Sequence, residues 1–126
     1  MKHPFIPLLG RILLALIFVI SGYGKIAGYS GTQAYMEQMG VPGMLLPLVI
    51  LLELGGGILI VVGFFTRWLA LLLALFCVVS AFMFHSSGDQ MQQIMFLKNL
   101  AMAGGFLLLM ANGPGQWSLD AKRGSD

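Results

Sequence analysis

The sequence predicts an all-α integral membrane protein, a bundle of four helices that cross the bilayer with both termini in the cytoplasm. Composition is the first reason: 58% of the 126 residues are hydrophobic and only 10% are charged. Soluble domains carry about 25% charged residues, so this chain lacks the charge that a water-facing surface needs. The second reason is that its apolar residues gather in long runs, each of which can cross the hydrocarbon core as one helix.

Four apolar stretches are each long enough to cross the bilayer: residues 5–23, 44–65, 68–84 and 94–111. Glycine and polar residues fill the breaks between them. The first stretch is expected to remain in the mature chain, because it is longer than the apolar region of a signal peptide and contains Arg11. The four spans together with the short loops between them use nearly all of the chain, which predicts one transmembrane domain, residues 1–126.

Positive charges predict the orientation of these spans. With four crossings, both termini and the break at Arg67 lie on one side of the membrane. That side holds Lys2, Arg11, Arg67, Lys122 and Arg123, and the other side holds Lys25 and Lys98. Positive residues mark the cytoplasmic side, so both termini are expected there.

The first outer loop, residues 24–43, has a pattern of its own. Ser30 and Gln33 have the spacing of a capping box, and apolar and polar residues then fall on opposite faces. This pattern predicts a short helix on the outer membrane surface. An irregular loop is the alternative.

Several kinds of chemistry lack their residues. The chain has no basic cluster for nucleic acid. Cys77 is the sole cysteine, which excludes an intrachain disulfide and a cysteine metal cluster. His3 and His85 belong to opposite sides of the membrane, so one subunit cannot hold a haem between them. We therefore expect no metal and no intrinsic cofactor, and any redox role needs an external electron carrier.

Charged residues within the spans need a reason, because a charge in hydrocarbon costs about 2.5–3.5 kcal/mol on insertion scales. Helical spacing places each of them beside small residues, which allow close helix packing. The predicted packing faces are Arg11, Ala15, Phe18, Gly22 and Lys25; Glu53, Gly56, Gly57 and Ile60; Ala70, Ala74, Cys77, Ala81 and His85; and Lys98, Ala101, Met102 and Gly105.

Depth then predicts which charges meet. Glu53 lies about 13 Å into its span, near the bilayer centre, and Arg11 is expected to reach it and form an ion pair. Glu53, His85 and Lys98 are expected to line a ligand site that opens toward the outer leaflet. The alternatives are an ion pair that only fixes helix register, lysines that extend to headgroups, and an interfacial histidine.

Short motifs in a fixed order extend over nearly the whole chain. They are Arg11, SGYGK (21–25), Gly-x-Pro (40–42), Glu53 followed by glycines, GFFTR (63–67), Lys98 with Asn99, and AGGFLLL to GPG (103–115). In these motifs the chain resembles DoxX-like proteins, small four-span proteins of the bacterial inner (plasma) membrane. The resemblance implies a multi-pass protein with a candidate internal ligand site at Arg11, Lys25, Glu53, His85, Lys98 and Asn99.

Function follows less directly from this resemblance. Some relatives are membrane subunits of a thiosulfate:quinone oxidoreductase, others are implicated in oxidative-stress complexes, and many have no assigned activity. The leading hypothesis is a membrane subunit that binds a quinone or similar small ligand inside the bundle. Its partners would be the lipid bilayer, a soluble or membrane redox protein, and further copies of the chain. The alternatives are a small-solute transporter and a non-enzymatic structural or assembly partner.

Overall fold

The structure is a computed structural model that describes residues 3–84 and 88–123, and this part of the chain contains helices but no strands. Four helices are long and apolar enough to cross a membrane: Phe5–Ala27, Gly43–Val62, Thr66–Phe84 and Gln90–Asn112. The predicted all-α class with four spans is therefore confirmed.

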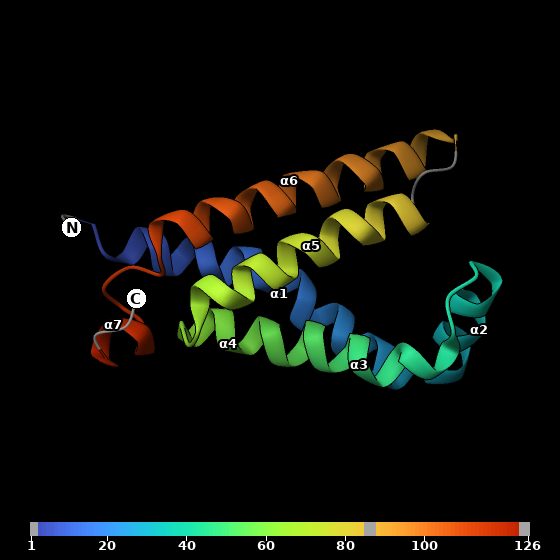
Figure 1. The fold of residues 1–126 in the computed structure, drawn as a ribbon, viewed down its shortest axis with the longest axis horizontal. Coiled ribbons are helices and arrows are strands. Elements are labelled where there is room, and N and C mark those ends of the chain that lie inside the picture. Colours follow the sequence, from blue (N-terminus) through green and yellow to red (C-terminus); the bar gives the residue numbers. More distant parts are fainter. Residues whose placement is uncertain (1–2, 85–87, 124–126) are drawn as a thin grey trace.

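The spanning helices form two hairpins. Helix α1 (Phe5–Ala27) packs along the second span, and α5 (Thr66–Phe84) packs along α6 (Gln90–Asn112), as Figure 1 shows. The second span consists of a 3-10 turn η1 (Gly43–Leu45), α3 (Leu46–Ile50), a π-helical turn η2 (Leu51–Gly55) and α4 (Gly56–Val62). Contacts between α4 and α5 join the two hairpins.

The second span ends earlier than predicted, at Val62 rather than at residue 65. Gly63 has a left-handed backbone with φ of 75°, and its N–H donates to the Leu59 carbonyl at 2.8 Å. Glycine adopts this conformation without steric cost and so terminates the helix. The fourth span begins earlier than predicted, at Gln90, where the Asp89 side chain accepts from the Gln92 N–H at 2.8 Å.

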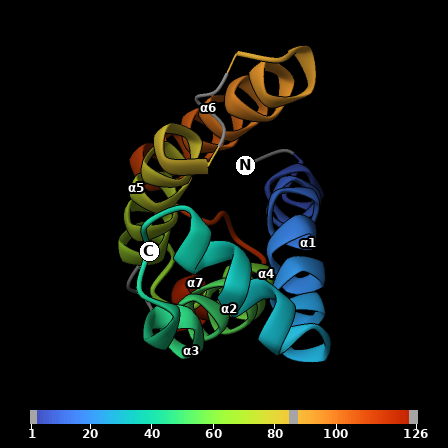
Figure 2. The same cartoon turned by 90° about the vertical axis from the view of Figure 1, so that its right-hand side faces the viewer.

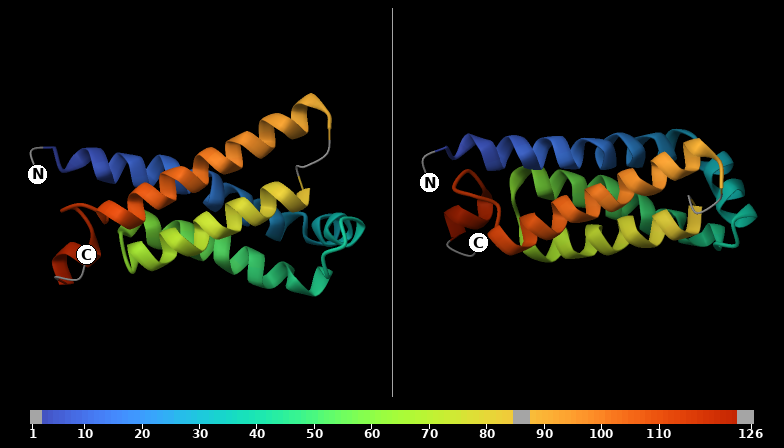
Figure 3. Two further views of the ribbon diagram at one scale, coloured as in Figure 1. Left: turned by 45° about the horizontal axis from the view of Figure 1, so that its top comes forward. Right: turned by 90° about the horizontal axis from the view of Figure 1, so that it is seen from above.

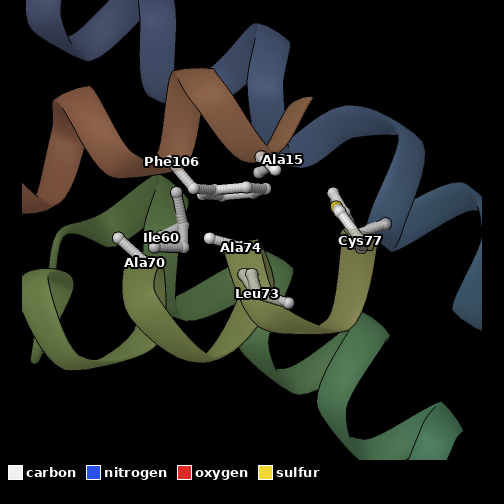
Figure 4. Packing of buried hydrophobic residues seen from close by; sticks show 9 residues of the cluster. Ala15, Ile60, Ala70, Leu73, Ala74, Cys77 and Phe106 are labelled. Carbon is white, nitrogen blue, oxygen red and sulfur yellow. The ribbon is translucent and has the colours of Figure 1, made fainter. Parts of the chain in front are cut away.

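The predicted packing faces are largely buried in the first three spans. The buried residues there include Arg11, Ala15, Phe18, Gly22, Glu53, Gly56, Gly57, Ile60, Ala70, Ala74, Cys77 and Ala81. Side chains from α1, α4, α5 and α6 meet in one apolar cluster (Figure 4). These small residues permit the close helix contacts expected in a membrane.

The fourth span departs from its predicted face. Ala103 and Phe106 are its buried residues, whereas Lys98 and Ala101 are exposed. Helix α6 stands away from α1 (Figure 2), so a large ring is needed between them in place of small residues. The Phe106 ring fills this role and contacts the Phe18 ring, with centroids 5.4 Å apart.

The two ends of the bundle differ. The start of α1 and α7 (Leu119–Arg123) lie at one end, called here the terminal end, and α2 (Tyr29–Gln38) lies at the other (Figure 3). Helix α2 follows Gly28 without a side-chain cap, so the Ser30 capping box is wrong, although the loop does contain a helix. The membrane side of each end, and the position of α2 on the membrane surface, stay predictions.

Candidate functional site

A cavity of about 480 Å³ occupies the α2 half of the bundle. All four spanning helices and α2 contribute to its walls, and its volume is in the range of small-molecule pockets. Aromatic rings, methionines and aliphatic side chains make up most of the lining. The polar lining residues are Ser21, Lys25, Thr32, Tyr35, Glu53, Ser80, Lys98 and Asn99.

Glu53 is the buried carboxylate of this cavity, with 6% of its surface exposed. The Lys25 Nζ lies 2.7 Å from Glu53 Oε1 and forms an ion pair with it. This contact holds the buried oxygen Oε1 against a charged group that also lines the cavity. Buried charges are normally paired in this way.

Local backbone geometry brings Glu53 to Lys25. A Cβ atom on Gly22 would lie only 2.8 Å from the Leu54 backbone nitrogen, so a glycine is needed where α1 touches η2. Lys25 follows Gly22 by about one helical turn and therefore reaches the carboxylate next to Leu54. Glu53 itself lies in the π-helical turn, a feature frequent at functional sites.

The predicted ion pair between Arg11 and Glu53 is wrong. The Arg11 guanidinium donates to the Ile60 and Val61 carbonyls at 3.2 and 3.0 Å and also to the Trp117 carbonyl. These contacts, called here the Arg11 junction, lie at the terminal end. Glu53 precedes Ile60 by seven residues, which is about 10 Å along a helix, so the antiparallel register separates the two charges.

Lys98 and Asn99 line the cavity from α6, on the same side as Met95 and Met102. The Asn99 Nδ2 donates to the Met95 carbonyl at 2.9 Å, which occupies one of its donors. The Lys98 ammonium has no hydrogen bond or ion pair within residues 3–84 and 88–123. The structure thus brings together four of the predicted site residues, Lys25, Glu53, Lys98 and Asn99. His85 lies outside the described residues.

Helix α2 covers the end of the cavity, which the sequence interpretation missed. Thr32, Tyr35 and Met36 line the cavity, and the Tyr35 ring stacks on Phe84 with centroids 5.7 Å apart. The Gln33 Nε2 donates to the Gly43 carbonyl at 3.3 Å and ties α2 to the second span. The apolar face of α2 was visible in the sequence, but the surface that it would cover was not.

Ser21 and Ser80 were also missed as lining residues. Each is a hydroxyl inside an apolar span, and this was a signal that could have found them. Cys77, by contrast, is buried in the apolar core cluster and does not line the cavity. Among the described residues, no three His, Cys, Asp or Glu side chains gather as metal ligands would.

Sequence comparisons identify the family. The sequence model of the DoxX family matches residues 6–86. The chain is 55% identical to "Inner membrane protein YqjF" of Escherichia coli (strain K12), over 90% of this chain and 88% of the relative. It is 41% identical to "Inner membrane protein YphA" of the same organism, over 95% and 91%.

A more distant relative is "Putative oxidoreductase CatD" of Bacillus subtilis (strain 168), which is 34% identical over 54% of this chain and 51% of the relative. No solved structure matches. The extended similarity to the two inner-membrane proteins agrees with the four spanning helices, and the protein is a multi-pass protein of the inner membrane. The match across more than half of its length shows that the chain belongs to the DoxX family.

Proposed function

We propose that the cavity binds a quinone or a similar small ligand, and that the protein is the membrane subunit of a quinone-linked redox system. One observation carries this proposal: a mostly apolar cavity of about 480 Å³ is lined by a buried carboxylate, Glu53, and by the lysine paired with it, Lys25. Ligand pockets combine an apolar lining with a few polar groups that orient the ligand. A quinone has an apolar ring that suits the lining and polar oxygens that suit these groups.

The polar groups match both oxidation states of such a ligand. Quinone carbonyls accept hydrogen bonds, which the Lys25 ammonium and the Ser21 and Ser80 hydroxyls can donate. Quinol hydroxyls donate hydrogen bonds, which Glu53 Oε1 can accept. Conversion of quinone to quinol takes two electrons and two protons. Lys25 and Glu53 are the groups positioned to exchange protons, and a partner oxidoreductase would supply the electrons.

The comparisons support the redox part only through a name, since CatD is named an oxidoreductase and matches about half of this chain. A structural role is the principal rival, because the Lys25–Glu53 pair also ties α1 to η2. The second rival is solute transport, with Glu53 as a binding site near the bilayer midplane. The experiment below separates ligand binding from a purely structural pair.

Two substitutions test the cavity as a binding site. Ser80→Leu should fill part of the cavity while keeping every charge, and Glu53→Gln should remove the carboxylate. We expect each to lower the affinity for 2-methoxy-1,4-naphthoquinone by about tenfold or more, which corresponds to the loss of one good contact. Titration calorimetry of the full chain in lipid nanodiscs measures the affinity, and native mass spectrometry reports any co-purified quinone.

Glu37→Gln is the matched control, because Glu37 is an exposed carboxylate on α2 that does not line the cavity. Melting temperatures of the same preparations show whether each variant is folded. Unchanged affinity in a folded Ser80→Leu protein would contradict a ligand in this cavity. If the wild type binds no quinone and Glu53→Gln fails to fold, the structural role of the Lys25–Glu53 pair is favoured.

A further inference from the structure

We propose that the ligand of this cavity carries an acidic group, such as an ionised hydroxyl or a carboxylate, that pairs with Lys98. This inference rests on the proposed function, since it assigns a charge to the ligand of the same site. Its basis is the charge balance of the lining: two lysines, Lys25 and Lys98, face one carboxylate, Glu53.

Lys98 lies deep in its span. It follows the first residue of α6, Gln90, by eight positions, which corresponds to about 12 Å along the helix. The midpoint of this 23-residue span is only three positions further on. Charged groups at such depth are almost always paired or face a cavity, because hydrocarbon does not solvate them. Lys98 faces a cavity, but it is not paired within the described residues.

The chain offers Lys98 no acidic partner within the described residues. It has five acidic residues in all, and Asp126 lies outside the described part. Glu53 is paired with Lys25, and the Asp89 side chain caps the start of α6. Asp120 accepts hydrogen bonds from the start of α5 at the terminal end, and Glu37 does not line the cavity. The missing anion must therefore come from elsewhere.

The position of Lys98 favours a ligand over a lipid headgroup as this anion. Lys98 lines the cavity together with Met95, Asn99 and Met102, which recur at helical spacing on the same side of α6. An anion held there would have its apolar part inside the cavity, against the rings of Phe76 and Phe84. A neutral ligand would leave Lys98 unpaired, whereas a singly charged anion would balance the site.

A pair of probes of nearly equal shape tests this inference. The hydroxyl of 2-hydroxy-1,4-naphthoquinone is ionised near neutral pH, and 2-methoxy-1,4-naphthoquinone is neutral. We expect the wild-type protein in zwitterionic nanodiscs to bind the anionic probe on the order of 10–100 times more tightly, because truncating one partner of a desolvated ion pair has effects of this size. Lys98→Met should abolish the preference, and Lys98→Arg should keep it.

Lys122→Met is the matched control, because this exposed lysine lies in α7 at the terminal end. Its preference should equal that of the wild type. Equal affinities of the wild type for the two probes, or a preference that survives Lys98→Met, would overturn the acidic ligand and leave quinone binding in place. Binding of neither probe would instead overturn the proposed function. If Lys98→Met does not fold, the wild-type preference between the two probes and its retention in Lys98→Arg still test the acidic ligand. The same titrations in nanodiscs that contain anionic lipid test the lipid alternative. If anionic lipid abolishes the preference for the anionic probe, the anion that pairs with Lys98 is a lipid headgroup and the acidic ligand is contradicted.

Discussion

Two buried charges, Arg11 and Glu53, lie in opposite halves of the bundle and are satisfied in different ways. At the Arg11 junction, both Nη atoms donate to backbone carbonyls, and only Nε lacks a partner. Two of these carbonyls belong to the last turn of α4, where helix geometry leaves oxygens free. At Glu53, the partner is one lysine, the π-helical turn disturbs the backbone, and open volume adjoins the carboxylate.

This difference indicates that buried charged residues have different surroundings in the two halves of the bundle. The Arg11 junction joins α1, α4 and the segment before α7, and a Cβ on Gly63 would collide with the Arg11 guanidinium and Ser118. Such close packing against Gly63 and Ser118 is typical of a structural contact. The Glu53 carboxylate instead pairs with a lysine side chain that lines the same cavity, so both charged groups adjoin open volume.

The largest expected effect comes from Arg11→Met, which tests the structural side of this comparison. Loss of the guanidinium leaves three carbonyls without their donor, so we expect the free energy of unfolding to fall by about 3–5 kcal/mol. Quinone affinity of the protein that remains folded should not change. Unfolding titrations in mixed micelles measure the stability. Arg67→Met is the control, because Arg67 is exposed and makes no hydrogen bond within the described residues.

The register of the first hairpin gives a smaller and sharper test. A double-mutant cycle with Lys25→Met and Glu53→Gln should give a coupling energy of about 1 kcal/mol, because the two charges are in contact. A cycle with Arg11→Met and Glu53→Gln should be additive within about 0.5 kcal/mol, since the residues share no partner. Coupling in the second cycle and none in the first would restore the pairing that the sequence suggested and contradict the observed register.

Sequence patterns were sufficient for the buried faces of α1, the second span and α5, because small residues at helical spacing mark the faces on which membrane helices can approach closely. They were insufficient for the partner of Glu53. Which charge it meets depends on the antiparallel register, set by contacts such as Gly22 against Leu54, and no single helix encodes it. The π-helical turn at Glu53 likewise has no signature in residue spacing.

The packing of the fourth span likewise could not be predicted from residue spacing. Its small residues suggested close packing, but α6 diverges from α1 and buries Phe106 instead. Lys98 on α6 lines the cavity while its surface remains exposed. Lys25, Glu53, Lys98 and Asn99 could thus be predicted as a group from depth and motif, whereas α2 as the cover required the structure.

The smallest expected effect concerns Asp120, which closes the terminal end beside the Arg11 junction. Its carboxylate accepts from the Phe65 and Thr66 N–H groups at 2.9 and 2.8 Å, at the start of α5. Burial alone would raise the pKa of this carboxyl, but the hydrogen bonds from Thr66 and Phe65, together with the positive charge of Arg123, lower the pKa below its ordinary value. The ionised form is therefore the one that stabilises the fold.

The sign of the pH effect follows from this lowered pKa. The contribution of Asp120 is complete above the unfolded pKa of about 3.9 and is lost as the pH falls through the lower folded value. We expect the melting temperature to drop on acidification from about pH 6 to about pH 3, and Asp120→Asn to reduce that drop while costing about 1 kcal/mol at neutral pH, as loss of a helix cap does. Melting curves of both proteins across this range measure this drop.

Because the cavity lies in the other half of the bundle, quinone affinity at neutral pH should be the same in Asp120→Asn as in the wild type. A loss of affinity in Asp120→Asn would mean that the two halves of the bundle are coupled rather than separate.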